Sequence, residues 1–351
     1  MDGSLHRQLL SLVKPRIVAL LCVTGAFATL AAGGTDPALL AAFLVAGACV
    51  AAGSAALNCW YDRELDRFME RTADRPLPSG KLDHRLAFAF ALALLGLGTT
   101  IGIATLPLAS VGFMLAGVAA YVVLYTVLLK RRHWLGVVLG GSAGSFPVLA
   151  GWAAVRPLTG EAVVLAAVVF AWTPAHAWAL ATAYREDFVR ADVPTLPVVA
   201  SSATVRRAVW YAAVATVLLA AVAVPFAGGI YAAVLVVGGA CFLLDYWGFY
   251  RNGGDALAVR AFFTSNTFLA LLFVAWGVGG VLGTGASAGT LLATAFGTGL
   301  AFVGLWSATP SLNGVESADA PIAPTRPWTV RRVAEYVRDN HLRGPRSSRD
   351  R

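Results

Sequence analysis

The sequence contains little charge and little cysteine. Only 13% of its 351 residues are Asp, Glu, Lys or Arg, whereas 58% are hydrophobic. A soluble domain carries roughly 25% charged residues, so most of this chain's surface must face something other than water. The four cysteines are scattered among apolar runs and show neither metal-ligand spacing nor a disulfide framework. These shortages exclude an ordinary soluble globular domain and a disulfide-stapled one.

Long apolar runs take the place of the missing charge. Mean hydropathy is +0.70, and runs of about 20 apolar residues are long enough to cross a bilayer as helices. The first run leads into another without a processing site, so the start is not a cleavable signal peptide. Ten runs, the last of them rich in Gly, Ala and Thr, cover residues 17–34, 38–58, 86–107, 109–129, 134–154, 162–183, 207–226, 228–249, 260–282 and 286–307. The sequence therefore predicts an all-α, polytopic transmembrane helix bundle over 1–310, with a basic cytoplasmic tail over 311–351.

The positions of Lys and Arg predict the orientation. When the ten spans are drawn, 26 of the 27 Lys and Arg fall on one side and only Arg156 falls on the other. Positive charge is retained in the cytoplasm during insertion, so the N-terminus, the long loops and the tail are expected to be cytoplasmic at the plasma membrane. The net charge of +8 follows from this topology and suits contact with anionic membrane lipid. It requires no nucleic-acid partner.

The loop over residues 59–85 begins with a row of polar side chains. Asn58, Asp62 and Asp66 are spaced four apart, which places them on one face of a helix leaving the membrane. Acids at that spacing repel each other, so a cation is expected between them. Carboxylate and carboxamide oxygens suit Mg²⁺, which commonly shares its ligand shell with substrate phosphates. The alternative is a surface helix whose acids form salt bridges with neighbouring arginines.

Arginines and prolines follow the acids in the same loop. Arg71 and Arg75 offer guanidinium groups that bind phosphate through two hydrogen bonds. Pro76 and Pro78 stiffen the chain on its way back to the membrane. Acids for a metal beside arginines for phosphate are the composition that a diphosphate site requires.

A second acidic loop follows the predicted span 162–183, on the same side of the membrane. Glu186, Asp187 and Asp192 supply oxygens, and Arg185 and Arg190 supply positive charge. Two acidic loops on one face predict two Mg²⁺ ions held around one diphosphate. The alternative for this segment alone is a plain solvated loop.

Several further residues are candidates for substrate contacts. Lys14 and the cluster beginning Lys130 and Arg131 lie where spans meet the same face, as diphosphate ligands or as topological anchors. His176 lies inside a predicted span, and an ionisable group at that depth suggests contact with an acceptor substrate. Its alternative is a hydrogen bond to a neighbouring helix. Asp245 is similarly costly in a membrane unless it lies near the interface.

These motifs resemble the UbiA superfamily of membrane prenyltransferases, and most closely its branch of protohaem IX farnesyltransferases (haem O synthases). The resemblance covers roughly three quarters of the chain. It is carried by KPRIV from residue 14, NCWYDRELDRFMERTADRPLPSG, LYTVLLKRR, GGSAGSFPVLAGWAA and WTPAHAWALATAYREDFVRADVPTLPVV.

The resemblance implies a nine-helix bundle that opens sideways to lipid, with Mg²⁺ bound by both acidic loops. It implies transfer of a farnesyl group from farnesyl diphosphate to a vinyl group of protohaem IX, which gives haem O. Tyr184 and Arg185 fit the segment before the second acid and join the candidate diphosphate ligands. The residues that match the family's metal-binding motifs are Asn58, Asp62, Asp66 and Asp187.

The chain also departs from the family pattern, at His133, Gly136, Ala175, Asp192 and Thr195. These positions lie near the expected acceptor or phosphate site, so the acceptor stays open between protohaem and an aromatic or quinone-precursor molecule. A membrane terpene cyclase of the same superfamily is a further alternative. A transporter or an oxidase assembly factor is the non-enzymatic one, although transport sites gather their ionisable groups near the midplane.

Overall fold

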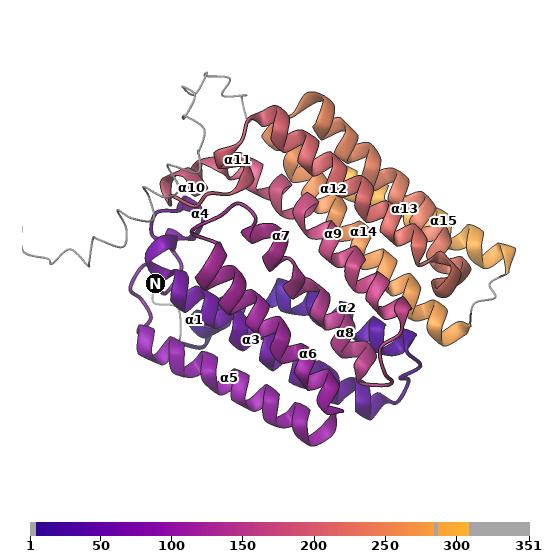
Figure 1. The fold of residues 1–351 in the computed structure, drawn as a ribbon, viewed down its shortest axis with the longest axis horizontal. Helices are drawn as coiled ribbons and strands as arrows, with labels where there is room; N and C mark the ends of the chain where they lie inside the picture. Colours follow the sequence, from indigo (N-terminus) through magenta and orange to yellow (C-terminus); the bar gives the residue numbers. More distant parts are fainter. Residues whose placement is uncertain (1–4, 284–286, 309–351) are drawn as a thin grey trace, which may run out of the picture.

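The computed structural model describes residues 5–283 and 287–308, and within them the chain forms only helices (Figure 1). The predicted all-α class is therefore confirmed. The predicted tail over 311–351 lies outside the described residues. The helices are α1 (Leu5–Leu12), α2 (Pro15–Ala31), α3 (Pro37–Asp66), α4 (Glu70–Ala73), α5 (His84–Thr105), α6 (Leu108–Val118), η1 (Ala119–Leu129), α7 (Gly136–Gly140), α8 (Ser142–Ala153), α9 (Gly160–Ala183), α10 (Arg185–Arg190), α11 (Leu196–Val199), α12 (Ser202–Val222), α13 (Val224–Asn252), α14 (Asp255–Leu282) and α15 (Ala288–Ala308).

Eight helical segments of the described chain are long and apolar enough to cross a membrane. They are α3, α5, α6 with η1, α7 with α8, α9, α12, α13 and α14. A ninth is the pair α1 and α2, which together pass the same test but are bent by 50°. The predicted tenth span coincides with α15, whose apolar part, Gly289–Leu305, is shorter than the others, so a tenth crossing stays a prediction.

Local capping explains where the spans begin. The Asp36 side chain accepts a hydrogen bond from the Ala38 N–H at 3.0 Å, and Pro37 occupies the first turn of α3. Asp83 accepts from the N–H groups of Arg85 and Leu86 at the start of α5. Asp is a preferred N-cap because its carboxylate satisfies N–H groups that lack helical partners. Each cap therefore marks a point at which the chain re-enters the bundle.

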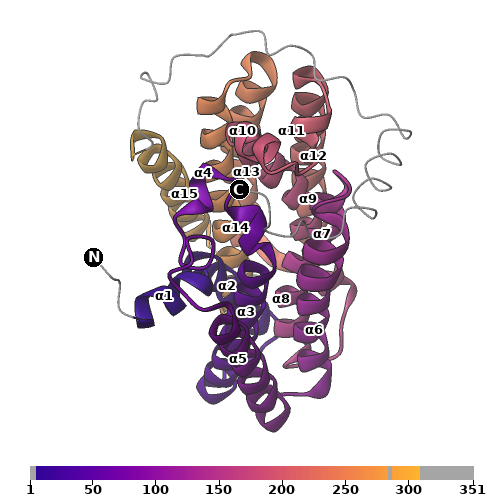
Figure 2. The same ribbon diagram turned by 90° about the vertical axis from the view of Figure 1, so that its left-hand side faces the viewer.

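Helices of the N-terminal half lie beside those of the C-terminal half, and α2 packs on both α8 and α14 (Figures 1 and 2). The short helices α4, α10 and α11 lie together at one end of the bundle in both views. The two acidic loops, which are more than 100 residues apart in sequence, thus share one face.

Small residues let the helix backbones approach closely. A Cβ atom built at Gly151 in α8 would lie 2.1 Å from the Gly25 carbonyl oxygen in α2. One at Gly53 in α3 would lie 2.8 Å from the Ala91 carbonyl oxygen in α5. Membrane helices associate through such contacts because lipid gives them no hydrophobic drive to associate.

We expect Gly151→Ala to destabilise the bundle. The added methyl group must push α2 and α8 apart, and overpacking of this kind costs about 1–3 kcal/mol. The midpoint of thermal unfolding in detergent would measure the loss. Gly96→Ala is the matched control, since nothing lies within 4 Å of its Cβ position. Equal midpoints for the two variants would contradict the close approach.

Candidate active site

The polar row at the end of α3 is buried and continuous. Asn58, Asp62 and Asp66 are all buried, with Asp62 only 1% exposed. The Asn58 amide donates to the Asp62 carboxylate at 2.8 Å, one helical turn away. The same amide group donates to the Thr126 hydroxyl of η1 at 3.0 Å. The three side chains share one face of the helix, as their spacing predicts.

Lys14 joins this row from the bend between α1 and α2. Its ammonium group donates to the side-chain amide oxygen of Asn58 at 2.6 Å and to the Tyr121 hydroxyl at 3.2 Å. Lys14 has φ 49°, a left-handed conformation that is uncommon for a residue other than Gly. The bend therefore directs a cation into the site.

Two basic side chains hold the Asp62 carboxylate. Lys130, which follows η1, donates to Asp62 Oδ2, and the Arg131 guanidinium lies 3.3 Å from Oδ1. The Lys130 side chain is only 12% exposed, whereas the Arg131 side chain is 36% exposed and reaches solvent. Both residues named from the basic cluster thus lie at the acidic row, and their binding of diphosphate stays a prediction.

The arginines of the first loop are divided between two partners. Arg75 lies 3.4 Å from the Asp66 carboxylate. Arg71 stacks its guanidinium over the Tyr184 ring at 5.2 Å. The structure therefore places one predicted phosphate ligand beside the acidic row and another against the second loop.

Asp187 joins the two loops. Its carboxylate accepts hydrogen bonds from the backbone N–H groups of Glu70, at 2.9 Å, and Arg71, at 3.3 Å, and from the Arg190 guanidinium. Burial acts to raise the pKa of Asp187, but the hydrogen bonds from Arg190 and the backbone outweigh it and hold that pKa below its usual value. The loops meet, as predicted, through the Asp187 carboxylate on the α4 backbone, the Arg71–Tyr184 stack and an Arg190–Glu70 ion pair.

The other candidates of the second loop face elsewhere. Glu186 is exposed. The Arg185 guanidinium donates to the Pro197 carbonyl oxygen at 2.8 Å and so holds α11 against α10. Within residues 5–283 and 287–308, no three acidic, His or Cys side chains lie close enough to hold a metal ion by themselves.

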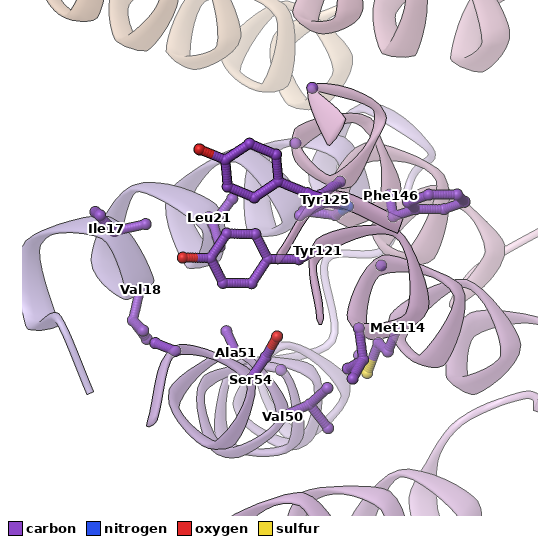
Figure 3. Close-up of a pocket in the computed structure, with 18 of the residues that line it drawn as sticks. Ile17, Val18, Leu21, Val50, Ala51, Ser54, Met114, Tyr121, Tyr125 and Phe146 are labelled. Carbon is purple, nitrogen blue, oxygen red and sulfur yellow. The ribbon is translucent and has the colours of Figure 1, made fainter. Parts of the chain in front are cut away.

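A cavity of about 320 Å³ begins at the charged row and runs between the helices (Figure 3). Lys14, Tyr121 and Ser54 line its charged end, and most other lining groups are apolar. We call this cavity the chamber. It is lined from α2, α3, α6, η1, α7, α8 and α9, with labelled side chains at Ile17, Val18, Leu21, Val50, Ala51, Ser54, Met114, Tyr121, Tyr125 and Phe146.

The π-helical geometry of η1 shapes the chamber wall. The Lys130 N–H donates to the Tyr125 carbonyl, five residues back, and the widened turn brings the rings of Tyr121 and Tyr125 into a stack at 6.0 Å. π-Helical turns are rare and frequently occur at functional sites. The two tyrosines and Thr126 were not among the residues predicted to form the site.

His176 and Asp245 have partners on α14. The His176 Nδ1 atom lies 2.7 Å from the Ser265 hydroxyl, and the ring stacks between Trp172 and Phe262. This is the hydrogen bond to a neighbouring helix that the sequence left open, and contact with an acceptor stays a prediction. Asp245 of α13 pairs with Arg260 of α14 at 2.8 Å and so belongs to the interface between α13 and α14.

Three of the departures from the family pattern line one small pocket behind Tyr125: His133, Gly136 and Thr195. A fourth, Asp192, has φ 53°, a left-handed conformation in which Gly is favoured and Asp is tolerated. The fifth, Ala175, is fully buried in α9.

The fold and the site define a class of protein: a polytopic membrane protein that presents a charged cluster above an apolar chamber. Such a site suits a substrate with an anionic head and a hydrophobic tail. The comparisons with known proteins identify the family.

Residues 19–268 match the UbiA prenyltransferase family. A protoheme IX farnesyltransferase of Rhodococcus jostii (strain RHA1) is 42% identical over 287 residues, which cover 78% of this chain and 93% of that protein. Another, of Trichormus variabilis, is 40% identical over 268 residues, with coverage of 74% and 84%. The chain belongs to the UbiA prenyltransferase family, so the predicted family is confirmed.

Solved structures show the same fold at low sequence identity. A digeranylgeranylglyceryl phosphate synthase matches with a TM-score of 0.65 at 18% identity, over 79% of this chain and 98% of that one. A UbiA homolog from Archaeoglobus fulgidus, bound to DMAPP and Mg²⁺, matches with a TM-score of 0.61 at 18% identity, over 78% and 99%. The likeness extends over nearly the whole length of each solved chain.

Proposed function

We propose that this protein transfers a farnesyl group from farnesyl diphosphate to a vinyl group of protohaem IX, giving haem O. The observation that carries the proposal is a row of acids and cations at the mouth of an apolar chamber. The names of the relatives support protohaem as acceptor and farnesyl as donor. We further propose that the site opens to the cytoplasm at the plasma membrane, because positive charge gathers on that face.

The donor set of the site suits Mg²⁺. Asp62 and Asp66 offer hard carboxylate oxygens one turn apart, and Mg²⁺ is commonly held by one or two carboxylates plus substrate phosphates and water. We assign Asn58, Asp62 and Asp66 to the first loop's share of that shell, with Asp187 and Glu186 as candidates from the second. When bound, the ion neutralises charge on the diphosphate oxygens.

The basic side chains have the task of stabilising the leaving group. Lys14, Lys130 and Arg131 now donate to the Asn58–Asp62 pair. In our proposal they turn their donors to the diphosphate, whose negative charge grows as the allylic C–O bond breaks. Preorganised donors aimed at developing charge are often the largest contribution to catalysis. Arg71 and Arg75, with Tyr184, Arg185 and Arg190, are the proposed outer ligands.

The chamber has the task of protecting an allylic cation. Its wall is almost entirely apolar, and the rings of Tyr121, Tyr125 and Phe146 face it (Figure 3). Aromatic faces attract cations, and exclusion of water prevents premature hydrolysis. Carbon 1 of the farnesyl group can then bond to the terminal carbon of the haem vinyl group.

The depth of the chamber supports a farnesyl donor. From Asn58 to Gly47, helix α3 advances eleven residues, about 16 Å at 1.5 Å per residue. An extended peptide residue contains three backbone bonds and spans about 3.6 Å, and an isoprene unit adds four chain bonds. Three extended isoprene units, with twelve bonds, therefore reach about 15 Å. Gly47 and Met114 line the chamber at that depth, and Phe43 lies one turn further along. A chain of three units therefore reaches Gly47 along α3.

Shortening the chamber is expected to change donor preference. Gly47→Leu would fill the far end, because a Cβ atom there already lies 3.8 Å from the Met114 methyl group. We expect kcat/KM for farnesyl diphosphate to fall about 10- to 100-fold, the range for a few methylenes that no longer fit. The value for geranyl diphosphate should change much less. Gly47→Ala is the control, and equal losses for both donors would argue against the assignment.

The overall proposal is tested with purified protein, Mg²⁺, farnesyl diphosphate and protohaem. Mass spectrometry should show haem O. A terpene hydrocarbon or alcohol formed without acceptor would indicate a cyclase, and diphosphate release only with an aromatic acceptor would indicate a different substrate. No diphosphate release with any acceptor would indicate a non-enzymatic role.

A further inference from the structure

A second, much smaller pocket lies next to the charged row. Its volume is about 10 Å³, close to the least space that holds one water molecule. Lys130, at the end of η1, and Thr195, at the start of α11, line it from opposite elements. It is distinct from the chamber, with which it shares only Tyr125 and Val137 among its lining residues.

One polar group in this pocket lacks a partner. Thr195 is only 7% exposed, and its hydroxyl makes no hydrogen bond within the part of the chain that the structure describes. A buried hydroxyl without a partner costs free energy, and such groups are commonly satisfied by an ordered water. The Lys130 ammonium group, which can donate three hydrogen bonds, offers such a water a second partner.

The pocket adjoins the chamber. His133, one of its lining residues, is exposed to solvent. Tyr125 and Val137 line both the pocket and the chamber and so separate the two cavities. A water held at Thr195 would reach the chamber past these two side chains, and its neighbour Lys130 already contacts the Asp62 carboxylate.

We propose that this pocket, built around Thr195, binds the single water molecule that ends the reaction. The inference rests on the proposed function. Bond formation between carbon 1 of the farnesyl group and the terminal vinyl carbon leaves a cation on the inner vinyl carbon. The water oxygen donates an electron pair to that carbon, a C–O bond forms, and the released proton goes to the departing diphosphate. The product is the hydroxylated side chain.

Without the water, the same cation has another outcome. It loses a proton from the adjacent methylene group to the diphosphate and becomes an alkene, which is lighter than the alcohol by one water. Thr195 is thus a positioning residue that determines which product forms, while the farnesyl transfer itself does not require it. The ratio of alcohol to alkene therefore reports on whether a water is held close enough to capture the cation.

The experiment compares Thr195→Val with the wild-type protein in oxygen-18 water. We expect total farnesyl transfer to stay within about twofold, and the ratio of alcohol to alkene to fall about fivefold, the effect of one lost hydrogen bond. Thr195→Ser should restore the ratio because it keeps the hydroxyl. Thr182→Val is the matched control, since that hydroxyl bonds the Trp178 carbonyl of its own helix.

Three results would overturn the inference. One is an unchanged product ratio in Thr195→Val beside an active wild-type protein. Another is a Thr195→Ser variant with the product ratio of the Val variant. The third, which does not depend on the folding of a variant, is a high-resolution structure of the wild-type protein without a water between the Thr195 hydroxyl and Lys130. A wild-type protein that forms no farnesylated haem would instead contradict the proposed function, and this inference with it.

Discussion

Asp62→Asn is expected to reduce the release of diphosphate from farnesyl diphosphate by about 10³-fold, the order that follows from losing one electrostatic contact to a transition state. Asp62 is the most deeply buried acid of the row and lies among Asn58, Lys130 and Arg131. The substitution preserves the shape of the side chain and removes its charge. Both its share of a metal shell and its hold on the two cations are lost.

The same substitution leaves the Lys130 ammonium group buried without its carboxylate, and an unpaired buried charge costs about 3–5 kcal/mol. A second variant, Asp62→Asn with Lys130→Gln, removes both charges and should restore the thermal midpoint in detergent without restoring turnover. Asp83→Asn is the control for an acid of the same loop, because Asn also caps helices well. Turnover of the Asp62 variant at the wild-type rate would refute the metal assignment.

The acidic row could be predicted from sequence because its geometry is local. Residues four apart share a helix face wherever the helix packs, so the spacing of Asn58, Asp62 and Asp66 determined their relation in advance. The start of α3 was equally local, since Asp36 and Pro37 form a cap and a first turn that no distant contact is needed to create. The spans followed from the length of the apolar runs.

The remainder of the site depends on contacts between distant segments. Thr126 accepts from Asn58, which is 68 residues away, and the widened turn of η1 that brings it there has no sequence pattern of its own. Asp187 was predicted to bind a metal, and the structure shows that it also accepts hydrogen bonds from backbone N–H groups of α4. A bond to a distant backbone leaves no pattern of side chains in the sequence, so it could not be predicted. The pocket at Thr195 likewise exists only where α11 meets η1 and α7.

Asp187→Asn is expected to distinguish two possible roles of Asp187, as a clamp between the two loops and as a metal ligand. As a clamp, Asp187 holds α10 against α4 through two hydrogen bonds from backbone N–H groups, while its third hydrogen bond, from Arg190, lies within α10. Asn keeps one carbonyl oxygen for the backbone, so the loops should still meet, although its bond to Arg190 loses its charge assistance. As a metal ligand, Asp187 would contribute a charge that Asn cannot replace, because Mg²⁺ prefers hard anionic oxygens.

The two roles predict different kinetics. A metal ligand would raise the Mg²⁺ concentration needed for half-maximal turnover and lower kcat about 10²-fold, as loss of one transition-state contact does. Loss of a clamp would leave the Mg²⁺ dependence unchanged and raise KM for farnesyl diphosphate, because the arginines of both loops would be held less firmly.

Arg190→Gln weakens the clamp without removing an acid, and it should reproduce only the rise in KM. We expect Asp187→Asn to show both effects and Arg190→Gln the KM effect alone, since the carboxylate that joins the loops is also a buried acid of the second loop. An unchanged Mg²⁺ dependence in Asp187→Asn would confine the metal shell to α3 and the substrate, and Asp187 would then act only by holding the second loop on the first.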